Sequence, residues 1–111
     1  MANLVHLEIL QEGVEKWNEW RRTHPEIKPD LSRVLLKGVA LDHIDLRGVN
    51  LAKAQLNGAF LTEARLEGAY LNEANLEKAH LQDAHLEGAS LQWAKLAGAD
   101  LRGIFLSKTT I

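Results

Sequence analysis

Leucine recurs every five residues through most of the chain, and this period constrains the fold more than any other feature. An amphipathic helix needs apolar residues about every 3.6 positions, and a strand needs them at every second position. A strict period of five therefore predicts a short turn-and-strand unit that stacks on copies of itself. Sixteen leucines follow the period without a gap, and Ile111 continues it: Leu31, Leu36, Leu41, Leu46, Leu51, Leu56, Leu61, Leu66, Leu71, Leu76, Leu81, Leu86, Leu91, Leu96, Leu101 and Leu106.

A second column of small residues precedes the leucines by two positions. Alanine holds this position in every unit from Ala54 to Ala99. The order small apolar, variable, leucine has the period of two that is typical of a strand, so two side chains of each unit point inward and the one between them points outward. The column contains larger or polar residues only near its ends, at Val34, Val39, Ile44, Val49, Ile104 and Thr109.

The remaining two residues of each unit must turn a corner. Glycine falls two positions after the leucine in every second unit, as at Gly38 and Gly58, and Lys78 is a substitution in this series. A type II turn needs positive φ at its third residue, which glycine adopts without strain. We expect two opposite corners of this type. A different turn is expected at the corners that carry Arg33, Lys53, Glu73, Trp93, His43, Glu63 and Asp83.

Residues 30–111 resemble the pentapeptide-repeat proteins, whose unit reads roughly Ala, Asp or Asn, Leu and two variable residues. The tripeptides at 74–76 and 99–101 fit this unit fully, and most other units keep alanine and leucine. The resemblance implies an all-β solenoid, a right-handed quadrilateral β-helix with four units per coil and about four coils. The segment before it, with Trp17, Asn18, Trp20 and Arg21, resembles the leader of some cyanobacterial members. We therefore expect a bacterial protein.

The first 29 residues follow a different pattern and are expected to form an N-terminal α-helical cap with a Pro-bounded linker, next to the β-helix at 30–111. Apolar residues recur there at steps of three and four, which predicts one amphipathic helix over residues 3–22. An open β-helix end exposes core side chains and unpaired backbone groups. The alternative is a helix that docks on a partner through Trp20. The capping face consists of Leu7, Leu10, Val14 and Trp17.

The other end of the predicted β-helix lacks a closing helix in this sequence. Ile104 and Thr109 replace the small residues, Phe105 takes an outward position, and Ile111 follows. We expect the same end of a second molecule to cover these four residues in a symmetric homodimer, because isologous contacts are the commonest oligomer interface. Several pentapeptide-repeat proteins pair in this way, which supports the expectation. The alternative is a twisted last coil that Phe105 and the terminal residues mask.

Charge separates two functional classes. Between residues 31 and 111, nine acidic side chains face nine basic ones, so this region carries no net charge, although residues 63–87 hold six acids and two bases. A DNA mimic that binds or protects a type II topoisomerase (DNA gyrase), as some family members do, needs a strongly acidic rod. It is kept as the alternative function. A nucleic-acid binder needs a basic stripe, which is absent, so we expect no nucleic-acid partner.

Other classes are excluded by composition. The chain has no cysteine, which excludes disulfides and thiol chemistry. The first ten residues lack positive charge, and no apolar run approaches the length of a membrane span, so we expect no signal peptide, no membrane partner and a cytoplasmic location. His80 and Asp100 share a face with Asp83 nearby, and His85 stacks between Arg65 and Phe105. All point outward from a convex rod, so we predict no metal, no cofactor and no enzyme.

An outward surface for protein contact remains. Four aromatic residues stand on otherwise polar faces, and aromatic side chains are enriched where proteins meet. Trp93 is the first candidate for a contact residue, because it lies on the coil next to the expected dimer end, and Phe105 is the second. The sequence therefore predicts a non-catalytic protein–protein interaction or scaffold module. Its candidate contact residues are Trp93, Phe105, Tyr70 and Phe60.

Overall fold

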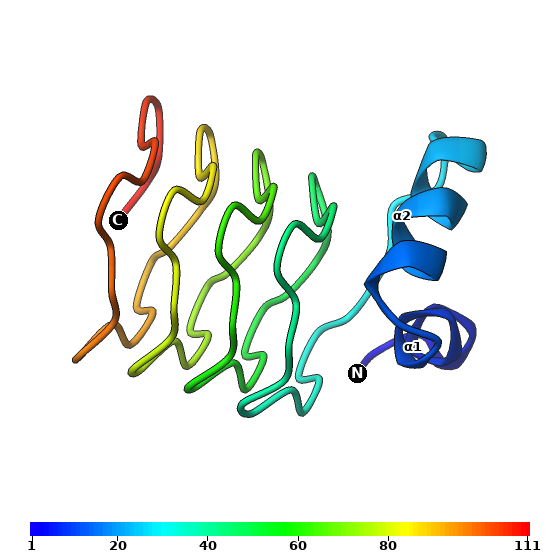
Figure 1. Ribbon diagram of the computed structural model, residues 1–111, viewed down its shortest axis with the longest axis horizontal. Coiled ribbons are helices and arrows are strands. Elements are labelled where there is room, and N and C mark those ends of the chain that lie inside the picture. The colour runs from blue at the N-terminus through cyan, green and yellow to red at the C-terminus, as the bar shows by residue number, and fades with distance from the viewer.

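The computed structural model describes residues 1–111 and consists of two short helices followed by a stack of turns (Figure 1). Helix α1 spans Leu4–Gln11 and helix α2 spans Val14–Thr23. The molecule measures 31 × 24 × 21 Å, and the helices lie at one end of its long axis while the C-terminus lies at the other (Figure 1). Neither helix has the length and apolar character needed to cross a membrane.

Parallel bridges join residues that lie twenty positions apart in the sequence. All thirteen bridges follow this rule, from Asp30↔Asn50 to Ser90↔Thr110. At each bridge two backbone hydrogen bonds form: the Leu31 N–H donates to the Asn50 carbonyl at 2.8 Å, and the Asn50 N–H donates to the Pro29 carbonyl at 3.0 Å. Four five-residue units thus return the chain to the same side. We call the successive stretches 30–49, 50–69, 70–89 and 90–109 the first to fourth coils.

The inward columns form one continuous apolar core. Every leucine of the period from Leu31 to Leu91 is buried, as is every alanine from Ala54 to Ala89. The expectation that all sixteen leucines lie inside is wrong at the last coil, where Leu96 is half-buried and Leu101 and Leu106 are exposed. No later coil lies over these side chains, so part of their surface stays open.

The corners differ from the prediction. All sixteen corner residues have a positive φ, between 57° and 73°, so the expectation of a different turn at Arg33, Trp93 and their equivalents is wrong. Each corner is closed alike, as where the Val34 N–H donates to the Leu31 carbonyl at 3.2 Å. The corner amide also bonds to the next coil, as from Arg33 to Ala52 at 2.9 Å. Stacking therefore imposes one backbone geometry on all corners, and non-glycine residues accept the strain.

The N-terminal segment forms two helices where one was predicted over residues 3–22. Gly13 separates them with a φ of 106°, which is incompatible with a continuing helix. Asn3 begins α1 by accepting hydrogen bonds from the Val5 and His6 amides through its side-chain oxygen. Of the predicted capping residues, Leu10 and Trp17 are buried, and Leu7 and Val14 pack against the core while partly exposed.

Side chains of helix α2 contact the first coil mainly at the backbone of one of its sides, residues 43–47. The Trp17 Nε1 donates to the Asp45 carbonyl at 2.7 Å, and the Asn18 side chain bonds to the Asp45 amide at 2.8 Å and to the His43 carbonyl at 3.1 Å. The Arg21 guanidinium donates to the Arg47 carbonyl at 2.7 Å. The Asp45 amide and carbonyl and the Arg47 carbonyl would otherwise pair with a preceding coil, as their equivalents in later coils do, so α2 satisfies them in its place.

Candidate interaction surface

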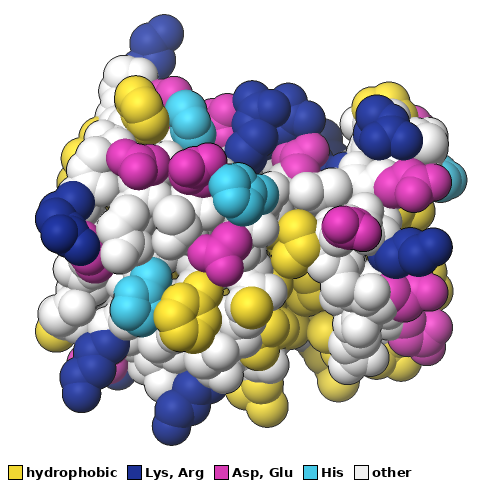
Figure 2. Space-filling view, viewed as in Figure 1, with side chains coloured by type: hydrophobic (Ala, Val, Ile, Leu, Met, Phe, Trp, Pro, Cys, Tyr) yellow, Lys and Arg dark blue, Asp and Glu magenta, His cyan; other side chains and the backbone are white.

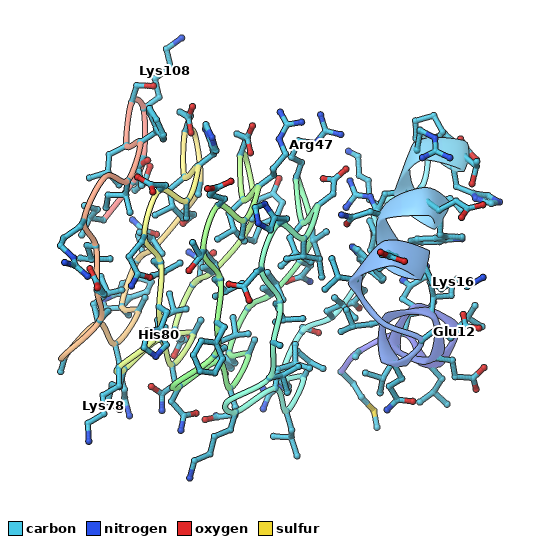
Figure 3. The ribbon with its side chains drawn as sticks, in the orientation of Figure 1. Glu12, Lys16, Arg47, Lys78, His80 and Lys108 are labelled. Carbon is cyan, nitrogen blue, oxygen red and sulfur yellow. The ribbon has the colours of Figure 1, made fainter.

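Phe60 and Phe105 each occupy the outward position between the two inward residues of their unit, where the backbone is bridged to the next coil. Each ring stacks on a histidine of an adjacent coil. The Phe60 and His80 rings lie 4.5 Å apart and 3° from parallel, and the His85 and Phe105 rings lie 4.4 Å apart and 5° from parallel. His80 lies on the outside of the coils in Figure 3. Because the backbone fixes both members of each pair, the pairs form rigid, partly apolar surfaces.

The four predicted aromatic residues do not form one patch. Phe60 and Phe105 belong to bridges on neighbouring sides, Ala40↔Phe60 and His85↔Phe105. Tyr70 lies on a third side, within the column of Asn50 and Ser90. Trp93 occupies a corner with φ 61° and is 78% exposed. Trp93 shares the fourth coil with Phe105, but the two residues lie on different sides of it.

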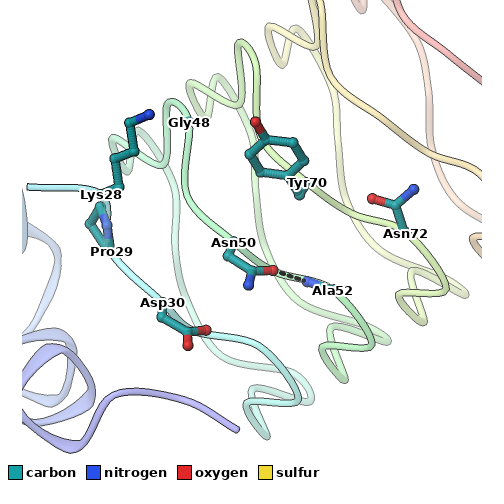
Figure 4. A pocket seen from close by; sticks show the side chains of 8 residues that line it. All are labelled: Lys28, Pro29, Asp30, Gly48, Asn50, Ala52, Tyr70 and Asn72. Atoms are coloured by element: carbon teal, nitrogen blue, oxygen red, sulfur yellow. Dashed lines mark hydrogen bonds between the residues drawn. The ribbon is translucent and has the colours of Figure 1, made fainter.

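Tyr70 borders a surface hollow of about 450 Å³ next to the Pro-bounded linker (Figure 4). Two of the polar side chains in it are already bonded: the Asn50 side-chain oxygen accepts from the Ala52 amide at 3.1 Å, and the Asn72 amide donates to the Ser90 hydroxyl at 2.7 Å. The hollow holds one carboxylate, Asp30, whose pKa is lowered chiefly by the hydrogen bond from the Ser32 amide.

Several charges on the coils are compensated by close neighbours. Within single units, Arg47 pairs with Asp45 at 2.8 Å and Arg102 pairs with Asp100 at 2.6 Å. The hydrogen bonds from Arg102 lower the pKa of Asp100 to about 2. Acidic and basic side chains are interspersed over the face shown in Figure 2, and Lys78 and Lys108 extend from opposite edges of the coils in Figure 3. This face therefore lacks a continuous field of one sign.

The histidines and acids considered as a metal site lie along two neighbouring columns, except Asp83, which lies at the corner between them. His80 and Asp100 are bridged, but the Asp100 carboxylate is held by Arg102 and by the Gln82 amide at 2.8 Å. His85 lies 3.4 Å from the Glu87 carboxylate and stacks on Phe105. No group of three or more His, Asp or Glu side chains is placed to hold a metal ion.

The C-terminal end of the stack presents an apolar surface. Ile104 packs against the core, and the Thr109 hydroxyl donates to the Leu86 carbonyl at 2.6 Å. Phe105 and Ile111 are exposed. A cavity of about 50 Å³ opens at this end and is lined only by apolar residues: Leu76, Leu81, Leu86, Leu91, Leu96, Leu101, Ile104, Leu106 and Ile111.

Sequence reasoning missed several residues that organise the N-terminal end. Asn18 and Arg21 were noted only as part of a leader, and His6, whose Nδ1 accepts the Asp30 N–H at 3.0 Å, was not noted at all. Trp20 is partly buried between the His6, Trp17 and His24 rings rather than presented to solvent. The sequence did contain a signal for one further residue, Leu35, because a leucine at an outward position is unusual in this repeat and indicates exposed apolar surface.

Comparisons with known proteins give one consistent result. The family model described as pentapeptide repeats matches residues 30–68 and 64–103. The pentapeptide repeat protein Rfr23 from the cyanobacterium Cyanothece 51142 is 38% identical over 76% of this chain, with a TM-score of 0.69. The pentapeptide repeat protein alr5209 from Nostoc Pcc 7120 is 37% identical over 75% of this chain, also with a TM-score of 0.69. The matched parts span 61% and 69% of those two chains. A search of curated proteins found no match.

Proposed function

The chain belongs to the pentapeptide repeat family, and we propose from this premise that it is a non-catalytic module that binds another protein through its outward side chains. Proteins of this family are generally structural modules. The two stacked Phe–His pairs carry the proposal, because they are rigid apolar surfaces presented on a charge-balanced exterior. Such surfaces bind a protein partner with little loss of side-chain entropy.

The architecture proposed for this module is a right-handed quadrilateral β-helix of about four coils with a helical cap. The bridges between residues twenty apart, which run from Asp30 to Thr110, support the coil geometry. The hydrogen bonds of Trp17, Asn18 and Arg21 to the first coil support the capping role of α2. The proposal places the module in the bacterial cytoplasm.

Affinity purification from cells of the native source tests the proposal. We expect the wild-type chain to retain a specific partner and the Trp93→Ala and Phe105→Ala variants to retain less of it. Lys95→Ala is the matched control, because Lys95 is an exposed residue of the same coil on another side. The proposal fails if the wild type retains no protein. The contact residues are wrong if both aromatic variants retain as much partner as the control.

We also propose that the C-terminal ends of two copies pair in a homodimer. The apolar cavity and the exposed Leu106 and Ile111 support this, because an apolar patch rarely stays open to water without a partner. Light scattering across a range of concentrations should show a dimer that Leu106→Asp converts to a monomer. Trp93→Ala should leave the dimer intact. A wild-type monomer at high concentration would refute the pairing.

The alternative function is that of a DNA mimic directed at a type II topoisomerase. The acidic excess at residues 63–87 is the observation in its favour. The pairing of Arg65 with Glu67 at 3.0 Å and of Lys53 with Glu73 at 4.0 Å opposes it, because these contacts reduce the field that a DNA-binding enzyme would recognise. A supercoiling assay with purified DNA gyrase distinguishes the two functions. Inhibition or protection at stoichiometric protein would replace the proposed interaction role with mimicry.

A further inference from the structure

One part of the first coil is not covered by either helix. In the second coil, Gln55 and Phe60 each use their N–H and carbonyl groups to bond to the first coil, at 2.7–3.0 Å. Leu35 and Ala40 are their equivalents one coil earlier, and their N–H and carbonyl groups have no protein partner on the helix side. The other two sides of this end are bonded by α1, α2 and the N-terminal residues through Asp30 and Asp45.

An apolar groove of about 340 Å³ lies beside these free backbone groups. Leu35 and Val39 are 79% and 38% exposed there, although Val39 belongs to the column that was expected to be internal. Hydrophobic side chains are visible in the hollow between the helices and the coils in Figure 2. Ten residues line the groove, and Gln11 is the only one with a polar side chain: Leu7, Leu10, Gln11, Gly13, Val14, Leu35, Leu36, Val39, Ala40 and Leu41.

We propose that this groove binds a segment of a partner protein, which follows residues 34–41 around the corner at Gly38 and bonds to them as a preceding coil would. The free N–H and carbonyl groups of Leu35 and Ala40 supply main-chain hydrogen bonds, and the groove supplies sites for apolar side chains. The spacing within the coils defines the ligand: two apolar residues with one outward residue between them, repeated after a turn. The absence of charged residues from the lining favours an uncharged apolar face on that segment.

The shape of the end selects this occupant over a second folded copy. A complete coil of another molecule would need all four sides of the first coil, and α2 occupies the side that contains Asp45. A volume of about 340 Å³ is also at the small end of the range of roughly 300–1,000 Å³ that is typical of ligand sites. It fits one short segment. The groove lies at the opposite end from Trp93 and Phe105, so this site is separate from the proposed contact surface (Figure 1).

A synthetic peptide that copies residues 74–81, with blocked ends, is a suitable probe because it contains two successive units of the repeat. In the free protein, amide hydrogen exchange of Leu35 and Ala40 should be fast, whereas that of Gln55 and Phe60 should be slow. Addition of the peptide should slow exchange at Leu35 and Ala40 and shift their NMR signals. Protection of these two amides in the free protein would contradict an open edge.

Two control comparisons make the test specific. Peptide copies that are N-methylated at the positions of Leu76 and Leu81 lack the donors for the Leu35 and Ala40 carbonyls and should not bind. Leu35→Asp should weaken binding of the unmodified peptide by at least about tenfold. Gln55→Asp places the same charge one coil further along the same column and should not weaken it.

Three outcomes would overturn the inference. The first is no binding at millimolar peptide. The second is binding that leaves the Leu35 and Ala40 amides unchanged. The third is protection of these amides that rises with protein concentration alone, which would identify a second copy as the occupant. Leu35→Asp should leave any partner captured through Trp93 in place, so failure here and failure of the proposed function are distinguishable.

Discussion

Leu66 and Leu106 occupy the same inward column but should differ greatly in what they contribute to stability. Leu66 lies in the second coil and is 0% exposed, whereas Leu106 lies in the last coil and is 41% exposed. Truncation of a fully buried leucine to alanine costs about 2–5 kcal/mol, because it removes apolar contact and leaves a cavity. We expect Leu66→Ala to fall in this range.

Leu106→Ala should cost less, for two reasons. Only about three fifths of its surface is removed from water, and a fully buried leucine gains roughly 1.5–3 kcal/mol, which leaves about 1–2 kcal/mol for Leu106. The space vacated at Leu106 also opens to solvent, so no closed cavity remains. Urea unfolding followed by circular dichroism, at low protein concentration, measures both free energies of unfolding.

One outcome of this comparison would refute the expected difference between the two leucines. Equal destabilisation by the two substitutions at low concentration would show that Leu106 is as buried as Leu66, and the open end described above would be wrong. If a second copy covers the end, the cost of Leu106→Ala should rise with protein concentration while that of Leu66→Ala stays constant, because association stabilises the folded chain by mass action.

Three further predictions concern single residues. Lys78→Gly should stabilise the fold by about 1 kcal/mol in urea unfolding. Glycine relieves the φ of 59° at Lys78, which costs roughly 1–2 kcal/mol, and this gain exceeds the roughly 0.4–1 kcal/mol that glycine loses through the greater entropy of the unfolded chain. Destabilisation would contradict this. Burial lowers the pKa of His6 below 6.5, so the stability it contributes should be present above pH 6.5 and decline as the pH falls toward the folded pKa. An NMR titration midpoint of His6 at or above 6.5 would refute it. The Asp100 carboxyl should titrate at about 2 rather than 3.8 because Arg102 bonds to it, with the associated stability present above pH 3.8 and lost as the pH falls through 2; Arg102→Met should return the midpoint toward 3.8.

The period of five predicted a stack of short units because leucine and alanine positions are fixed by the core, and the family resemblance implied that residues twenty positions apart stack. Their side chains face inward in every coil from Leu51 to Leu86, so composition and geometry agree there. The corners could not be read in the same way. Glycine at Gly38 suggested a special turn, yet Arg33 adopts the same left-handed backbone, because hydrogen bonding between coils outweighs the local preference.

The contacts of the N-terminal end also could not be predicted from the periodicity of the sequence. The break at Gly13 and the bonds of Asn18 depend on how α2 lies across a backbone edge, and no spacing in the sequence records that direction. The aromatic residues were found because they interrupt polar columns. Their distribution over separate sides followed only from the bridges, which place Phe60 and Phe105 on neighbouring sides and Tyr70 on another.

Function in such a stack must reside where the repeat is interrupted. In the interior every backbone group of the bridged positions is paired and every inward side chain is buried, so each coil already satisfies its neighbours. Free bonding capacity and open apolar surface remain at two places, beside Leu35 and Ala40 at one end and around Leu106 at the other. Main-chain groups are free at both ends, because the N–H groups of Leu96, Leu101 and Leu106 have no later coil to bond to. The two ends differ in the apolar surface beside these groups, which is a groove flanked by the helices at the first end and an uncovered face with a small cavity at the second. We therefore expect the first end to bind a single segment and the second to bind a complementary apolar surface.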